Sequence, residues 1–280
     1  ESAVMMVTGK EILTFMASPR IFSLQKLVEV ADFNMHSRSR LAWATIWSML
    51  AEHFTLVGTD ENLSVAMFAI DSLKQLSIKF LQKEELSNFN FQRTFLKPFE
   101  VIMGKSALEE IDELVLRCID MMILACAPNI RSGWRTIFTI FEATTRHPTP
   151  EVSESAFGII ERLMESWLDF LLQNDAVALM NCLVSFVGGR HAGLSLRALT
   201  HLRVCADKLA AHGGGGQSSE QAQQQIDGDQ SVFGLWWPLL FGLATHVADS
   251  RLEVRLKALN TLDVVLEIHG QLFSEQAWQV

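Results

Sequence analysis

The chain has 280 residues, with 32 Asp and Glu against 23 Lys and Arg, so its formal net charge is −9. Hydrophobic residues make up 49% of the sequence, which excludes an intrinsically disordered chain, because enough apolar side chains are present to offset the ordering entropy. The acidic balance argues against a general nucleic-acid binder, and no apolar run approaches the roughly 20 residues that cross a bilayer.

Apolar residues recur at three- and four-residue steps along most of the chain, which is the spacing of amphipathic helices. Residues 62–81 give the clearest example, and we expect Thr59 or Asp60 to cap that helix. Sustained two-residue alternation is not found, so no strand is predicted. In chain order the pattern predicts a lead-in helix at about residues 1–18 and further helices at about 20–33, 39–54, 62–81, 91–103, 108–125, 131–145, 152–172, 176–186, 192–211, 233–248, 253–269 and 275–280.

A weak internal repeat runs through these helices. Four of them follow a turn and are centred on a small residue, with separations of 38, 42 and 60 positions between the successive centres Cys118, Ala156, Ala198 and Ala258. The last interval falls to 43 without the segment from Gly213 to Asp229. Periods of about 40 to 47 residues are typical of HEAT and armadillo arrays. The sequence therefore predicts an all-α, armadillo/HEAT-like helical-repeat array (an α-α superhelix), with an irregular helical bundle as the alternative.

The expected organisation has three parts. A first part of the array covers residues 1–212, a Gly/Gln-rich disordered loop covers 213–230, and the array continues over 231–280. The loop has almost nothing to bury, and it is not a phosphate-binding P-loop, because no Lys-Ser or Lys-Thr follows its glycines. The chain starts without Met and stops inside a predicted helix, so we expect it to be a piece of a longer polypeptide.

No catalytic, cofactor or metal site is predicted. The eight histidines do not form an H-E-x-x-H motif, and no G-x-S-x-G elbow occurs. The carboxylates of residues 109–113 lie at a predicted helix start, where the helix dipole favours negative charge, so a solvated helix end is preferred over acid/base or calcium chemistry. The four cysteines lie among apolar helical neighbours, which favours reduced, packed thiols in a cytosolic protein over disulfides or metal ligands.

Two turns carry Trp and Arg, the commonest interface anchors. The first set, Arg38, Arg40, Trp43 and Trp47, opens the helix predicted at 39–54. Its alternative is that both indoles pack in the core while both arginines are solvated. The second set consists of Arg131, Trp134 and Arg135 around Gly133. Its alternative is a plain inter-helix turn whose Trp anchors the next helix.

Two further surfaces lie in the second half of the chain. Arg190, Arg197, His201 and Lys208 are spaced by 7, 4 and 7 positions and fall within one narrow helical stripe, which suits an acidic partner or anionic lipid. More often such a stripe is only the solvated side of a helix. An aromatic cluster follows the predicted loop, and core filling is preferred over membrane insertion for its members Phe233, Trp236, Trp237 and Phe241.

Several separate blocks of the sequence carry a family resemblance. They are residues 22–30, 33–35, 38–43, 69–77, 85–89, 129–134 and 251–255. In this order they resemble the large Arf guanine-nucleotide exchange factors of the BIG type, in the homology-downstream segments that follow the catalytic exchange domain. The resemblance runs from about residue 19 to about residue 273. One residue is inserted between Asn34-Met35 and the Arg38-x-Arg40 pair, and the Gly/Gln-rich insertion is particular to this chain.

The resemblance implies a parent protein that loads Arf-family GTPases with GTP at the trans-Golgi network, and a piece that lacks the catalytic domain and is not itself an enzyme. In the family, the first downstream segment is implicated in binding membrane-anchored, GTP-loaded Arf, which recruits and activates the exchange factor. We expect that contact at the 34–47 block, with Asn34, Arg38, Arg40, Trp43 and Trp47, or at the Arg131–Arg135 turn. The implied location is cytoplasmic and peripheral on trans-Golgi membranes.

The implied partners are Arf-GTP and the other domains of the parent, with a second copy of the chain and the Golgi membrane as further candidates and no nucleic acid. The alternative function is a structural spacer or homodimerisation scaffold of the same exchange factor. An enzyme comes third, since the sequence offers no set of convergent polar groups.

Overall fold

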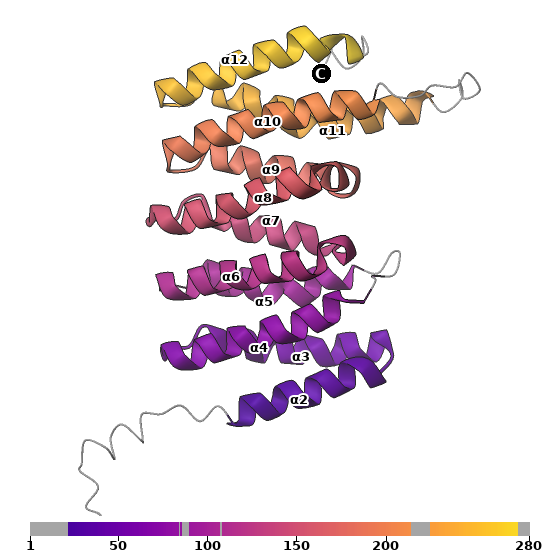
Figure 1. Ribbon diagram of the computed structural model, residues 1–280, viewed down its shortest axis with the longest axis vertical. Helices are drawn as coiled ribbons and strands as arrows, with labels where there is room; N and C mark the ends of the chain where they lie inside the picture. The colour runs from indigo at the N-terminus through magenta and orange to yellow at the C-terminus, as the bar shows by residue number, and fades with distance from the viewer. Residues whose placement is uncertain (1–21, 84, 86–89, 107, 214–224, 274–280) are drawn as a thin grey trace, which may run out of the picture. The chain divides into compact units, whose positions relative to one another are not determined.

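The computed structural model describes residues 22–83, 85, 90–106, 108–213 and 225–273. Within these ranges the chain is almost entirely helical and contains no strand, which confirms the all-α helical-repeat prediction (Figure 1). The α-helices are α2 (Phe22–Ser37), α3 (Arg40–Gly58), α4 (Leu63–Leu81), α5 (Phe91–Lys105), α6 (Glu109–Cys126), α7 (Gly133–Thr144), α8 (Pro150–Asn174), α9 (Ala176–Val187), α10 (Ala192–Gly213), α11 (Gln225–His246) and α12 (Leu252–His269). Two 3-10 turns cover Ala127–Asn129 and Gly270–Leu272.

Two details of the prediction were wrong. Helix α11 begins at Gln225 and not near Phe233, so residues 225–230 of the expected loop are helical, while 214–224 lie outside the described residues. The cap of α4 is Asn62, whose side chain accepts hydrogen bonds from the backbone of Ser64 and Val65. The side chain of Asp60 instead accepts a hydrogen bond from the backbone N–H of Asn62 at 2.8 Å, in the turn that precedes α4. The helices expected at 1–18 and 275–280 also lie outside the described residues.

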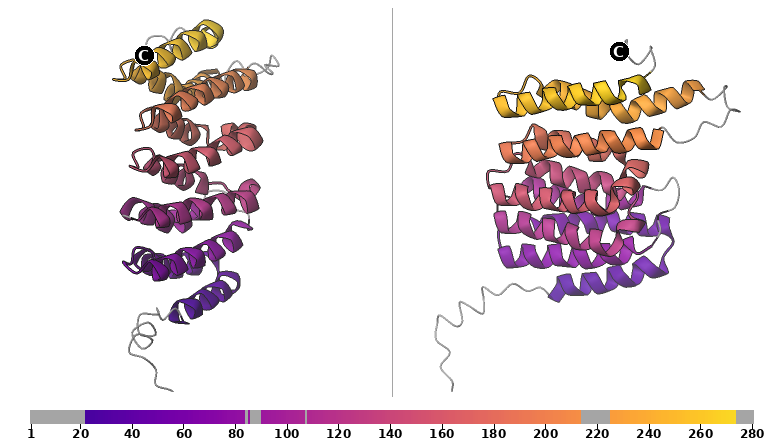
Figure 2. Two further views of the ribbon diagram at one scale, coloured as in Figure 1. Left: turned by 60° about the vertical axis from the view of Figure 1, so that its left-hand side comes forward. Right: turned by 45° about the horizontal axis from the view of Figure 1, so that its top comes forward.

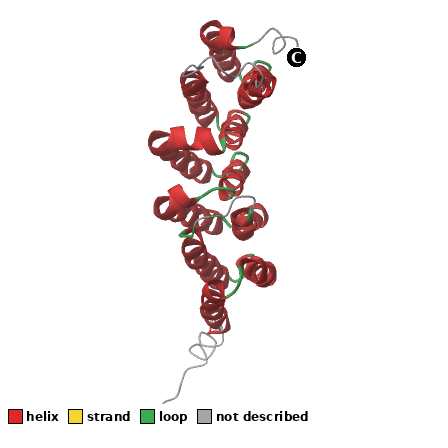
Figure 3. Ribbon diagram, turned by 90° about the vertical axis from the view of Figure 1, so that its right-hand side faces the viewer, coloured by secondary structure: helices red, strands yellow, loops and turns green. Residues whose placement is uncertain are grey.

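The chain divides into two compact units, with the boundary after Ile130. In the first unit α3 packs against α5, α4 packs against α6, and α2 lies against α4 (Figures 1 and 2). In the second unit α9 packs between α7 and α11, and α10 packs between α8 and α12. Each unit therefore has two layers, which Figure 3 shows as two rows of helices within a unit. The first layer consists of α3 and α5 in the first unit and of α7, α9 and α11 in the second. The second layer consists of α2, α4 and α6 in the first unit and of α8, α10 and α12 in the second. The division expected at the Gly/Gln-rich insertion stays a prediction.

The internal repeat has a structural counterpart in hydrogen bonds. Ser153 donates to the carbonyl of Thr144 at 2.7 Å, and Ser195 donates to the carbonyl of Phe186 at 3.1 Å, each across nine positions. Each serine lies three residues before a fully buried alanine, Ala156 or Ala198. The small residue lets a neighbouring helix approach, and the hydroxyl ties the end of one helix to the start of the next.

Aromatic side chains fill the core of the first unit between its layers. The ring of Phe95 stacks on Trp47 at 3.8 Å and on Phe80 at 4.3 Å between centroids. Trp43 lies 6.1 Å from Trp47, and both indoles are buried. Because each such ring removes about 150–250 Å² from water, this stack is a major source of the unit's stability.

Candidate functional site

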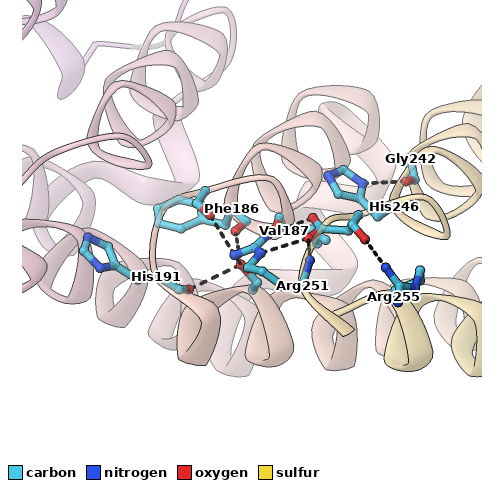
Figure 4. Close-up of polar contacts among 10 residues, drawn as sticks. Phe186, Val187, His191, Gly242, His246, Arg251 and Arg255 are labelled. Atoms are coloured by element: carbon cyan, nitrogen blue, oxygen red, sulfur yellow. Dashed lines mark hydrogen bonds and ion pairs between the residues drawn. The ribbon is translucent and has the colours of Figure 1, made fainter. Parts of the chain in front are cut away.

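A densely connected polar cluster in the second unit centres on Arg251, the residue before α12 (Figure 4). Its guanidinium donates to the carbonyls of Val187 at 2.8 Å and Gly189 at 2.9 Å, and to the hydroxyl of Ser195 at 3.0 Å. It also donates two hydrogen bonds of 2.9 Å to the carboxylate of Asp249. These contacts match the five N–H donors of an arginine.

The partners of Arg251 show what the cluster does. The hydrogen bonds from Arg251 hold the pKa of Asp249 down at about 2, so that carboxylate is charged. The backbone carbonyl of Asp249 accepts from Arg255 at 2.9 Å. The cluster therefore joins the turn before α12 to the turn between α9 and α10, and it stacks one helical pair on the next. Its donors are engaged within the fold, so it is not arranged to act on a ligand.

Close backbone approach accompanies this junction. A Cβ at Gly242 of α11 would lie 2.3 Å from Cγ2 of Val184 on α9. A Cβ at Gly189 would lie 3.0 Å from the carbonyl oxygen of Thr145. A side chain at residue 242 would therefore force α11 and α9 apart, whereas one at residue 189 would require a shift of a few tenths of an ångström at the end of α7.

The first predicted binding set is divided between core and surface. Trp43 and Trp47 are buried, so the indoles belong to the core, as the alternative interpretation had it. Arg38 and Arg40 are exposed at the turn between α2 and α3. The Nε of Arg38 donates to Oδ1 of Asn34 at 3.0 Å, and Asn34 in turn donates to the Val30 carbonyl, which ties the turn to the end of α2.

The second predicted set is divided in the same way. Trp134 is buried and stacks with Phe138 at 5.9 Å. Arg131 is half-buried, lies 5.3 Å from the Phe170 ring and donates to the Asn174 side chain at 3.3 Å. Arg135 is exposed, and its Nε lies 3.8 Å from Oδ1 of Asp175. Arg135 is therefore the member that is most accessible to a partner.

The predicted basic stripe is largely neutralised by α8. Arg197 bonds to Glu154 and Glu161, and His201 lies 3.2 Å from Glu161. Lys208 donates to Asp169 at 3.0 Å. The hydrogen bond from Arg197 is the main cause of the lowered pKa of the Glu161 carboxyl. Arg190 is exposed but precedes α10, so the four residues do not form one free cationic surface.

The aromatic cluster of α11 points in two directions. Trp236 is buried and packs on His269 at 5.7 Å and on Phe273 at 5.2 Å, in agreement with the preferred core-filling interpretation. Trp237 and Phe241 are exposed and stack on each other at 5.6 Å. The side chain of Phe233 lies outside the described residues.

Two chemical expectations concern the carboxylates and the thiols. Glu109, Glu110 and Asp112 fall in the first turn of α6, where the helix dipole favours them. Within the described ranges, no group of three potential metal ligands comes together, and no helix is long and apolar enough to cross a bilayer. All four cysteines are buried and none is in a disulfide, and burial raises the pKa of Cys118 and Cys205 to about 12.

Comparison with known proteins shows which proteins the chain is similar to. The family model described as Mon2/Sec7/BIG1-like, HDS matches residues 79–162. Brefeldin A-inhibited guanine nucleotide-exchange protein 1 of Arabidopsis thaliana is 39% identical over 279 residues, which cover 93% of this chain and 16% of that relative. The human protein of the same name is 35% identical over 269 residues, which cover 93% of this chain and 14% of that relative.

A yeast relative gives the same result. The ADP-ribosylation factor guanine nucleotide-exchange factor sec72 of Schizosaccharomyces pombe is 37% identical over 267 residues, or 94% of this chain and 14% of that relative. The chain thus spans between 14% and 16% of the length of these relatives. The chain therefore matches the HDS family model over residues 79–162 and, over more than nine-tenths of its length, is similar to one region of the BIG-type exchange proteins.

Proposed function

We propose that the chain is a non-catalytic regulatory module of an Arf guanine-nucleotide exchange factor, and that it binds membrane-anchored, GTP-loaded Arf to recruit and activate its parent at the trans-Golgi network. The observation that carries the proposal is the identity of 35% to 39% with exchange proteins over more than nine-tenths of the chain. The helical array supports a binding role, because stacked helical pairs present extended surfaces suited to partner proteins.

We assign the proposed Arf contact to exposed arginines that lie next to buried tryptophan side chains. In the first unit these are Arg38 and Arg40 at the α2–α3 turn, and the buried Trp43 holds the start of α3 in place beneath them. In the second unit Arg135 stands on α7 one residue after the buried Trp134. An arginine whose support is fixed by core packing loses less entropy when it binds. Dependence on GTP follows if the contact includes the switch segments of Arf, whose conformation the nucleotide sets.

The experiment is a binding measurement with Arf locked in each nucleotide state. The chain is expected to bind the GTP form and not the GDP form. Arg38→Glu and Arg135→Glu are each compared with an exposed basic residue of the same unit, Lys105→Glu and Arg146→Glu respectively. Equal binding of both nucleotide states, or no binding, refutes the proposal, and equal effects of the test and control variants refute the assigned residues.

A second candidate function is a structural scaffold that pairs two copies of the parent. The exposed apolar residues Leu252, Leu256 and Leu259 on one side of α12 favour it, because contiguous apolar surface marks interaction sites. Light scattering separates the two functions: a rise from one chain to two with concentration, abolished by Leu256→Glu, supports the scaffold. Binding of Arf-GTP by a chain that stays monomeric supports the regulatory module.

A further inference from the structure

The first unit exposes an apolar surface at its N-terminal end, which we call the α2–α3 face. On α3 it consists of Leu41, Met49 and Leu56, which are 75%, 72% and 71% exposed. On α2 the exposed large apolar residues are Phe22, Val30 and Phe33. An exposed apolar surface contributed by two adjacent helices usually meets another part of the protein or a partner.

Other first-layer helices show what α3 lacks. Helix α9, which packs between α7 and α11, has Val177 as its one exposed large apolar side chain, at 41%. Helix α5 of the first unit has none. Helix α3 packs against α4 and α5 but has no first-layer neighbour on its other side among the described residues. We therefore expect the exposed apolar residues of α3 to be covered by another first-layer helix on the side opposite α5.

The order of the layers identifies where that helix should come from. In each described pair a first-layer helix precedes its second-layer partner, as α3 precedes α4 and α9 precedes α10. Helix α2 packs against the second-layer helix α4, and the described residues before α3 contain no first-layer partner for it (Figure 1). By this order, the missing partner is the segment immediately before Phe22.

We propose that residues 1–21 cover the α2–α3 face as the first-layer helix of the opening pair. At 100° per residue, Met5, Ile12, Leu13 and Met16 fall within an arc of about 100°, with Glu11 and Thr14 on the opposite side of the helix and Val7 and Phe15 outside the arc. Pro19 disfavours helix at the residue before it and leaves a short turn to Phe22.

The segment also has the required length. Fifteen helical residues before Pro19 extend about 22 Å, and Leu41 and Leu56, fifteen positions apart on α3, are separated by the same distance of about 22 Å along the helix axis. Covering of the face by this segment leaves the α2–α3 turn, at the opposite end of α2 from Phe22, open to a partner.

The test is a double-mutant cycle in the full 280-residue chain, read by hydrogen exchange of the α3 amides. Ile12→Glu and Met49→Glu are each expected to speed that exchange about tenfold, because each separates the segment from the face. The double variant is expected to match the single variants, since a detached segment has nothing further to lose. Leu124→Glu on α6, a residue that is 76% exposed, serves as the control and leaves α3 unchanged.

Cross-linking identifies the occupant directly. The four native thiols are buried, so a flexible bis-maleimide reacts selectively with the pair Ile12→Cys and Met49→Cys. A cross-link within one chain supports the proposal. Cross-links that form only between chains would show that a second copy covers the face, and this result would overturn the proposal. Additive effects of the two substitutions in the double-mutant cycle, or unchanged hydrogen exchange of α3 in Ile12→Glu, would also overturn it.

Discussion

Removal of the Arg251 side chain tests whether the inter-pair cluster stabilises the array. Arg251→Ala deletes five hydrogen bonds, three to Val187, Gly189 and Ser195 and two to Asp249. It also leaves the Asp249 carboxylate, only 10% exposed, without its cationic partner. Breaking a buried ion pair costs about 3–5 kcal/mol, and because Arg251 is itself 25% exposed we expect the lower limit, about 3 kcal/mol.

The assay is thermal unfolding followed by helical circular dichroism, with hydrogen exchange to locate the change. A loss of about 3 kcal/mol lowers the midpoint by about 6 to 12 °C in a domain of this size. Exchange is expected to rise most in α12 and in the α9–α10 turn. Arg251→Lys should recover only about half of the loss, because an ammonium keeps the charge but not the planar fork of donors.

Two results would refute this reasoning. The first is a loss below about 1 kcal/mol, the range of an ordinary exposed substitution. Arg190→Ala, an exposed arginine near the same turn, provides that reference. The second is strict additivity between Arg251→Ala and Asp249→Ala, because groups that act together give a measurable coupling energy in a double-mutant cycle.

Three further predictions concern pH, packing and thiol reactivity. The folded-state pKa of Asp249 is lowered from 3.8 to about 2, so its ionisation contributes about 2 kcal/mol of stability that is present above pH 4 and is lost as pH falls toward 2. Acid titration of stability should show this loss in the native chain and not in Asp249→Asn. Gly242→Ala should lower the free energy of unfolding by about 1–3 kcal/mol in urea, because its Cβ would lie 2.3 Å from Val184. Gly234→Ala on the same helix is the control: its Cβ would meet nothing within 4 Å, so this variant should be neutral or stabilising. Cys205 is buried and its pKa is raised to about 12, so it should resist iodoacetamide at pH 8 and react only after addition of urea. Mass spectrometry measures this labelling, and rapid labelling of the native chain would contradict the burial of Cys205.

Some of the candidate site could be predicted because the signals are local. The spacing of apolar residues in 62–81 gave a helix whose observed bounds are Leu63–Leu81, since a helix is defined by contacts three and four residues apart. The carboxylates of α6 were placed correctly at a helix start for the same reason. Small residues such as Ala156 and Ala198 revealed the repeat, because close helix packing demands them at fixed positions.

Other residues could not be assigned without their neighbours. The spacing of Arg197 and Lys208 describes one side of a helix but not what faces it, and Glu154 and Asp169 of α8 lie about 40 positions away in the chain. Arg251 was quoted only as part of a family block, and its role was missed. The Asp-x-Arg spacing before a helix start was the available signal.

The sequence by itself determined the helical class, most helix bounds, the repeat centres and the family, because each depends on residue types within a short window or on matched blocks of residues. The tertiary structure decided which side chains are available: it buried Trp43, Trp47 and Trp134, paired the α10 cations with α8, and assigned Arg251 to the junction between helical pairs. Burial and charge pairing depend on segments far apart in the chain, and only folding determines which of them meet.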